Sequence, residues 1–166
     1  MGTDPYPHQA RYMDKFEKTL IAGWRDMDYN SHMANTAYLD RAADVRMMYF
    51  AENGFSAEDL LRMKIGPVVM KDEIEYFREV QLLQEIRVNL VCAGLSPDGS
   101  RFVLRNEFAH VDGKRCAVVT STGGWLDLQT RKLIAPPQAL REAQEALEKA
   151  EDFRAMKSSV AAQNPA

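Results

Sequence analysis

One long apolar helix, placed early in the chain and followed by strands with tight turns, constrains the fold most. Residues 36–53 carry apolar side chains at helical spacing in two adjacent stripes. The stripes are Tyr38, Ala42, Val45 and Tyr49, and beside them Leu39, Ala43, Met47 and Phe50. Because they cover a wide surface together, we expect this helix to be largely buried. The later strands lack the crossover helices of a parallel sheet, so we predict an α+β fold, an antiparallel sheet wrapped around one helix.

Alternation and turn residues predict the remaining elements. We expect strands at 16–25, 68–77, 86–92, 102–111 and 116–128, a short helix at 56–63 and a charged surface helix after Pro136-Pro137. Asn35 is expected to cap the long helix and Gly54 to end it. Gly123-Gly124 indicate a bulge or a close backbone approach. We predict an N-terminal arm (1–15), one domain (16–153) and a C-terminal tail (154–166).

The composition excludes several classes of protein. The 166 residues suit one domain, and Lys+Arg 21 against Asp+Glu 24 leaves a net charge of −3, which argues against a nucleic-acid binder. Apolar runs are too short to span a membrane, and the first residues contain no apolar export segment. Cys92 and Cys116 could form at most one disulfide, so a reducing cytoplasm is the expected location.

A polar loop directly before the long helix carries the most specific motif. It reads Asp26-Met27-Asp28-Tyr29-Asn30-Ser31-His32-Met33-Ala34-Asn35, and Tyr38-Leu39 follow. This stretch and the element order resemble the hotdog-fold acyl-CoA thioesterases, in particular the 4-hydroxybenzoyl-CoA thioesterase group. Their loop has an Asp-x-Asp-x-x-Gly-His-Val-Asn-Asn-like pattern, and the resemblance extends from about Lys18 to Pro137. Ser31 stands where Gly is usual, and Ala34 where the first Asn is usual.

The resemblance implies a catalytic role for three residues of this loop. Thioester hydrolysis needs a nucleophile or a base that activates water, and donors for the developing oxyanion. Asp28 matches the family's catalytic carboxylate, acting as general base or as nucleophile. The backbone amide of Asn35, at the helix N-terminus, would polarise the thioester carbonyl. His32 could orient Asp28, contact the substrate or hold the loop.

Further residues are candidates for binding the substrate. They are Ser31 and Tyr38 near the loop, Thr122 from the last long strand, and Arg131 and Lys132, which could bind the phosphates of coenzyme A. Each also has a structural interpretation, since aromatic helix residues are usually core, Thr is common in strands and basic pairs are usually exposed. We interpret Asp26 as solvated. We expect no cofactor and no metal, because three scattered histidines lack ligand spacing.

Three functions fit a hotdog domain with this loop. The first is hydrolysis of an acyl-CoA or acyl carrier protein thioester by a homodimer or homotetramer, whose active site, by resemblance, lies between subunits. The second is a hydratase or dehydratase, which normally arranges its His and carboxylate differently. The third is a non-catalytic acyl-CoA sensor, which would lack the carboxylate and often add a DNA-binding segment. The presence of Asp28 and the absence of a basic recognition helix favour hydrolysis, and we expect no nucleic-acid or membrane partner.

Overall fold

The computed structural model describes residues 15–160, so nearly all of the predicted arm and the last part of the predicted tail lie outside it. Its elements, in chain order, are β1 (Glu17–Ile21), the 3₁₀ helix η1 (Trp24–Asp26), α1 (Asn35–Glu52), α2 (Ala57–Arg62), β2 (Ile65–Tyr76), β3 (Glu85–Asn89), β4 (Val91–Leu95), β5 (Arg101–His110), β6 (Arg115–Asp127), β7 (Leu133–Ile134), α3 (Gln138–Glu145) and β8 (Lys149–Ala155). No helix within 15–160 is both long and apolar enough to cross a membrane.

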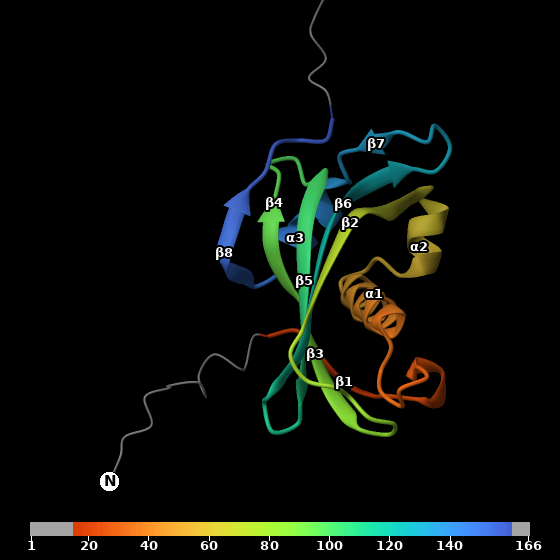
Figure 1. The fold of residues 1–166 in the computed structure, drawn as a ribbon. Helices are drawn as coiled ribbons and strands as arrows, with labels where there is room; N and C mark the ends of the chain where they lie inside the picture. Colours follow the sequence, from red (N-terminus) through yellow and green to blue (C-terminus); the bar gives the residue numbers. More distant parts are fainter. Residues whose placement is uncertain (1–14, 161–166) are drawn as a thin grey trace, which may run out of the picture.

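The strands form one sheet that is antiparallel except at one pair. β6 pairs with β2, β5 and β7, while β5 continues the sheet to β3 and β4. β1 closes one side by pairing with β3, and β8 adds to β4 in the parallel direction. The long helix α1 lies beside this sheet (Figure 1). The predicted α+β hotdog architecture, an antiparallel sheet with one central helix, is therefore confirmed.

The first apolar stripe of α1 forms the centre of the core. Tyr38, Ala42, Val45 and Tyr49 are all buried, as expected. In the second stripe only Phe50 is buried, and Leu39 and Met47 pack at the margin of the core. Full burial of one such side chain contributes about 1.5–3 kcal/mol, so this stripe accounts for the position of the helix.

The ends of the helices follow the sequence pattern except at one point. Gly54 adopts φ 90° just after the C-cap Asn53, and Ser56 forms the expected capping box with Asp59. The prediction that Asn35 caps α1 is wrong, because Ala34 is the N-cap and Asn35 is the first helical residue. Ala34 makes no side-chain capping hydrogen bond to the amides at this end.

Two predicted elements differ in extent. The strand expected at 86–92 is divided at Leu90 into β3 and β4, both of which pair with β5. The C-terminal helix α3 stops at Glu145, and the predicted domain boundary at residue 153 falls inside strand β8. After α3 the chain pairs with the open edge of β4, where Cys92 N donates to Glu148 O at 2.8 Å. The helical pattern of the C-terminal segment does not reveal this pairing.

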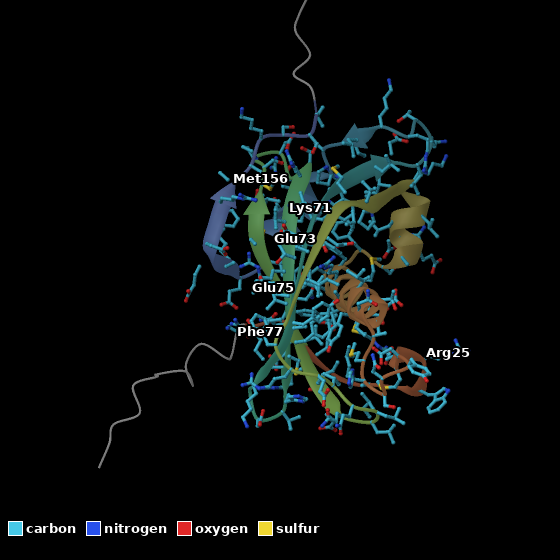
Figure 2. The ribbon with its side chains drawn as sticks, in the orientation of Figure 1. Arg25, Lys71, Glu73, Glu75, Phe77 and Met156 are labelled. Carbon is cyan, nitrogen blue, oxygen red and sulfur yellow. The ribbon has the colours of Figure 1, made fainter. Side chains whose placement is uncertain are left out.

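Strand β2 pairs only with β6, and its other edge has no neighbouring strand among residues 15–160. Figure 2 labels Lys71, Glu73 and Glu75 along this strand, and all three are exposed. These residues form a solvated face of the strand. Gly123 on β6 shows why glycine is required there, because a Cβ would lie 2.3 Å from Val68 O in β2.

Candidate active site

The loop between η1 and α1 is folded around the carboxylate of Asp28. Oδ1 accepts the Asn30 amide at 2.8 Å and the His32 amide at 3.4 Å. The Asp28 amide in turn donates to the His32 carbonyl at 2.9 Å. Within the described chain no donor reaches Oδ2, and the side chain is 34% exposed. Because the contact with the His32 amide is long, Oδ1 stabilises the turn and can still accept from one further donor, and Oδ2 accepts from none within the described chain.

Asp26, which we expected to be solvated, is buried and anchors the loop from behind. Its carboxylate lies 2.8 Å from Arg41 Nη2 in α1 and accepts the Gly23 amide at 2.7 Å. The Asp26 carbonyl also accepts the Ala34 amide at 2.8 Å. The hydrogen bond to Asp26 raises the pKa of Arg41 despite partial burial of the guanidinium. This pair fixes both ends of the segment that carries Asp28.

Ser31 lies in the left-handed backbone region, with φ 66°. Its amide donates to Asp28 O at 3.1 Å, so the residue closes the turn. Glycine adopts this conformation without strain, which gives a physical reason for the glycine that the resemblance expects at this position. Serine is compatible with the same turn at a modest energetic cost.

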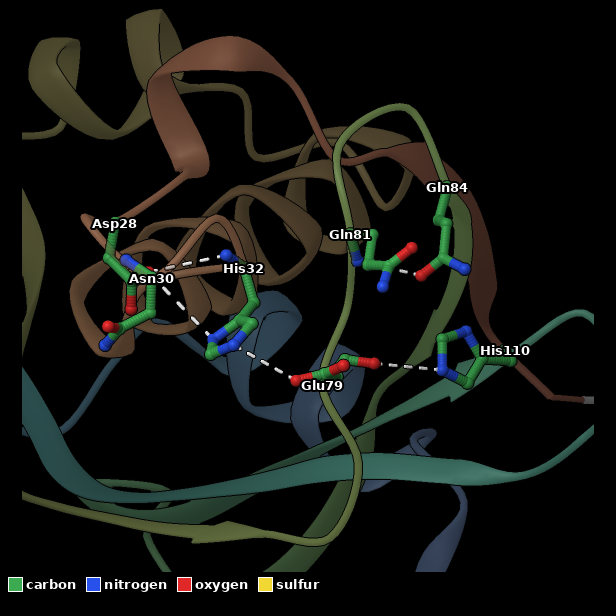
Figure 3. Close-up of polar contacts among 7 residues, drawn as sticks. All are labelled: Asp28, Asn30, His32, Glu79, Gln81, Gln84 and His110. Atoms are coloured by element: carbon green, nitrogen blue, oxygen red, sulfur yellow. Dashed lines mark hydrogen bonds and ion pairs between the residues drawn. The ribbon is translucent and has the colours of Figure 1, made fainter.

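His32 joins this loop to the connection between β2 and β3, and Figure 3 shows the contact. Its Nε2 lies 3.1 Å from Glu79 Oε2, and its Nδ1 lies 4.0 Å from Asp28 Oδ1. On the far side, His110 Nε2 lies 3.1 Å from the Glu79 carbonyl. Glu79 was not a candidate from the sequence, because it stands in a connection without motif or periodicity. Only the pairing of the two loops brings it to His32.

The N-terminus of α1 presents unpaired backbone donors beside the loop. Ala37 N donates to Ala34 O at 3.0 Å, but the amides of Asn35 and Thr36 find no acceptor within the described chain. Such amides lie at the positive end of the helix dipole and suit an oxyanion or a carbonyl oxygen. This is the arrangement that the Asn35 prediction requires, through its backbone rather than its side chain.

A cavity of about 290 Å³ adjoins Asp28. Its lining comprises Trp24, Met27, Asp28, Ser31 and Leu82. Trp24 is 80% exposed, so its ring presents a large apolar surface to solvent. A carboxylate at the rim of a partly apolar cavity is an arrangement that can place an acyl thioester against a base.

Tyr38 is 2% exposed and packs edge-on against Tyr76 and Phe108. Burial is the main cause that raises the pKa of its hydroxyl to about 12, and the negative charge of Asp28 adds to it. The hydroxyl therefore stays protonated at neutral pH. The ring therefore belongs to the core.

The other predicted binding residues lie away from Asp28. The side chain of Asn106 on β5 bonds Arg46 of α1, so it faces the helix. Asn106 pairs with Val119 on β6, which therefore faces α1 as well. Because side chains alternate along a strand, Thr122 lies on the sheet face turned away from α1. Arg131 and Lys132 are exposed in the turn between β6 and β7. Figure 1 places that turn at the opposite end of the molecule from the loop before α1. The structure therefore brings Asp28, Ser31, His32 and the Asn35 amide together, but not these three.

Two further expectations concern cysteines and metals. Cys92 and Cys116 are both buried and free. Among residues 15–160, no three His, Cys, Asp or Glu side chains are grouped so that they could hold a metal ion.

Comparison with known sequences identifies the family of the chain. The sequence model of the thioesterase-like superfamily matches residues 22–144, so the chain belongs to that superfamily. The matched range begins before the Asp28 loop and extends into α3. No curated protein gives a significant sequence match.

Solved structures with the same fold include several thioesterases. The chain resembles Slr0204, a 1,4-dihydroxy-2-naphthoyl-CoA thioesterase from Synechocystis, at TM-score 0.70 and 15% identity, covering 78% of this chain and 95% of that one. It resembles the gentisyl-coenzyme A thioesterase BH1999 at TM-score 0.68 and 15% identity, with 75% and 98% covered. It also resembles SAV2348 from Staphylococcus aureus, solved in complex with CoA, at TM-score 0.71 and 18% identity, with 80% and 85% covered. At these identities the likeness establishes the fold.

Proposed function

We propose that this protein hydrolyses an acyl-CoA thioester to the free acid and CoA. The observation that carries the proposal is the carboxylate of Asp28, which lines a cavity and lies in the same loop that leads to the unpaired amides of α1. Membership of the thioesterase-like superfamily, and neighbours named for CoA thioesters, support the same reaction.

The site residues have distinct tasks in this reaction. The thioester carbonyl oxygen is held by the Asn35 amide, whose hydrogen bond strengthens as negative charge develops. Asp28 either removes a proton from the attacking water or attacks the carbonyl itself to form an anhydride that water then hydrolyses. In both routes the C–S bond breaks and CoA leaves as a thiolate, which needs little help from a general acid. The exposed Trp24 supplies an apolar wall for the acyl group or the pantetheine arm.

Two other functions receive less support. A hydratase or dehydratase usually arranges its His and carboxylate differently, whereas His32 Nδ1 lies 4.0 Å from Asp28 Oδ1 within one loop. A sensor without turnover would not need an open carboxylate at the cavity. Acyl carrier protein thioesters stay within the proposal, because the site residues act on the thioester rather than on the carrier.

We further propose that the working unit is a homodimer or a dimer of dimers. The free edge of β2 offers unpaired backbone groups, and Val69, Met70 and Tyr76 on this strand are 46%, 49% and 54% exposed. An unpaired apolar edge is a template for pairing with another strand. A second copy of β2 in antiparallel register would cover it. Light scattering on the purified protein measures the assembly, and a monomer at micromolar concentration would contradict this.

A thiol-release assay tests the proposed reaction. The panel is acetyl-, hexanoyl-, palmitoyl- and 4-hydroxybenzoyl-CoA, with the wild type, Asp28→Asn and Asp40→Asn. Asp40 is an exposed aspartate of α1, so its variant is a matched control for the same chemical change. We expect turnover in the wild type and in the control, and a loss of about 10²-fold or more in Asp28→Asn. Equal activity in all three proteins would remove Asp28 from the mechanism, and tight acyl-CoA binding without turnover would favour the sensor.

A further inference from the structure

The imidazole of His32 lies between two carboxylates that come from different parts of the chain. Nε2 is 3.1 Å from Glu79 Oε2, and Nδ1 is 4.0 Å from Asp28 Oδ1 (Figure 3). A neutral imidazole carries one hydrogen, and a carboxylate oxygen can only accept. The contact with Glu79 therefore favours the hydrogen on Nε2, which leaves the lone pair of Nδ1 on the side of Asp28.

The position of Glu79 is fixed by its backbone and by the two residues that follow it. The Glu79 carbonyl lies 3.1 Å from His110 Nε2, whose N–H donates to it. Val80, which is fully buried, accepts the Met33 amide at 2.8 Å. The next residue, Gln81, forms an isolated bridge with His32. The side chain of Glu79 is itself 57% exposed, so this framework, rather than burial, holds it in place.

The spacing between His32 and Asp28 suits one bridging water. At 4.0 Å the two atoms are too far apart for a direct hydrogen bond. A water about 2.8 Å from each of them, with an angle of about 90° at its oxygen, would span that separation. A water held in this way has two acceptors for its hydrogens and keeps a lone pair for a carbonyl carbon.

We propose that Glu79 is a positioning residue that acts through His32, fixing the imidazole so that Nδ1 and Asp28 together hold the hydrolytic water. The proposal rests on the proposed thioester hydrolysis and selects its general-base route. The water oxygen forms the bond to the thioester carbon, one proton passes to the Asp28–His32 pair, and collapse of the tetrahedral intermediate breaks the C–S bond. The thiolate leaves and recovers the proton, so no other reactant is needed. Orientation of a base by a third group is the logic of hydrolytic triads.

Kinetics with Glu79→Ala test this assignment. We expect kcat to fall about 10-fold or more with KM nearly unchanged, because the substrate does not contact Glu79. The matched control is Glu85→Ala, an exposed glutamate at the start of β3, which should retain wild-type kcat. In a His32→Ala background the Glu79 substitution should have no further effect on kcat. An equal loss in both backgrounds would overturn the proposal, because Glu79 would then act independently of His32.

A second readout does not depend on turnover. ¹⁵N NMR of the histidine ring nitrogens reports which nitrogen carries the hydrogen, and His32→Ala identifies the His32 signals. We expect the Nε2–H form in the wild type and a mixture of forms in Glu79→Ala. Unchanged His32 signals would overturn the proposal even if the variant lost activity. If no thioester is turned over by the wild type, the hydrolase proposal fails, and the NMR result still decides whether Glu79 orients His32.

Discussion

The loop that carries Asp28 depends on one partly buried ion pair, and Asp26→Ala tests how much the loop depends on it. The substitution removes the contact of 2.8 Å with Arg41 and the hydrogen bond of 2.7 Å from the Gly23 amide. Exposed ion pairs contribute about 0–1 kcal/mol, whereas loss of one partner of a buried pair costs about 3–5 kcal/mol. The side chain of Asp26 is 10% exposed and that of Arg41 is 29% exposed, so this pair lies between the two cases. We therefore expect the free energy of unfolding to fall by about 2–3 kcal/mol.

Asp44→Ala is the matched control, because Asp44 contacts the same guanidinium. Its carboxylate lies 3.5 Å from Arg41 Nη1 and its side chain is 52% exposed, so we expect a change within about 0.5 kcal/mol. Urea denaturation followed by circular dichroism gives the free energy of each variant. In a double-mutant cycle with Arg41→Met, Asp26 should show a coupling energy of about 1–2 kcal/mol. If Asp26→Ala is no more destabilising than Asp44→Ala, or if the cycle is additive, the anchor argument is refuted.

Two further substitutions test the cavity and the sheet. Trp24→Ala should raise KM for acyl-CoA several-fold in the thiol-release assay and leave the melting temperature nearly unchanged, because the ring is 80% exposed; an unchanged KM would exclude it as a substrate wall. Gly123→Ala should lower the free energy of unfolding by about 2–3 kcal/mol, since the new Cβ meets backbone at 2.3 Å. Gly54→Ala, where a Cβ meets nothing within 4 Å but φ is +90°, should cost only about 1 kcal/mol in the same denaturation experiment. Equal effects of the two glycine substitutions would contradict the steric argument.

The sequence predicts the parts of this fold that local patterns encode. Burial of Tyr38 and Val45 follows from helical spacing, and the close approach at Gly123 follows from paired glycines inside a strand pattern. Strand β8 is different, because its partner is the open edge of β4, more than fifty residues earlier in the chain. Residues with an amphipathic helical pattern become a strand when such an edge is available. No property of the segment alone reveals this.

The same distinction applies within the candidate site. Asp28, Ser31 and His32 stand together in one loop, so a motif finds them. Whether Asp26 is solvated depends on Arg41, which lies fifteen residues later in α1 and binds the carboxylate.

Glu79 extends this argument, because it contacts the loop from the β2–β3 connection, whereas Asp26 is bound by α1. The bridge between His32 and Gln81 and the bond from Met33 to Val80 align two segments that are separated by the whole of α1, α2 and β2. The Asp26–Arg41 contact holds the loop to α1, and the Glu79 contact holds the imidazole of His32 to the β2–β3 connection. Substitutions on the two sides should therefore separate, with Asp26 acting mainly on stability and Glu79 mainly on kcat.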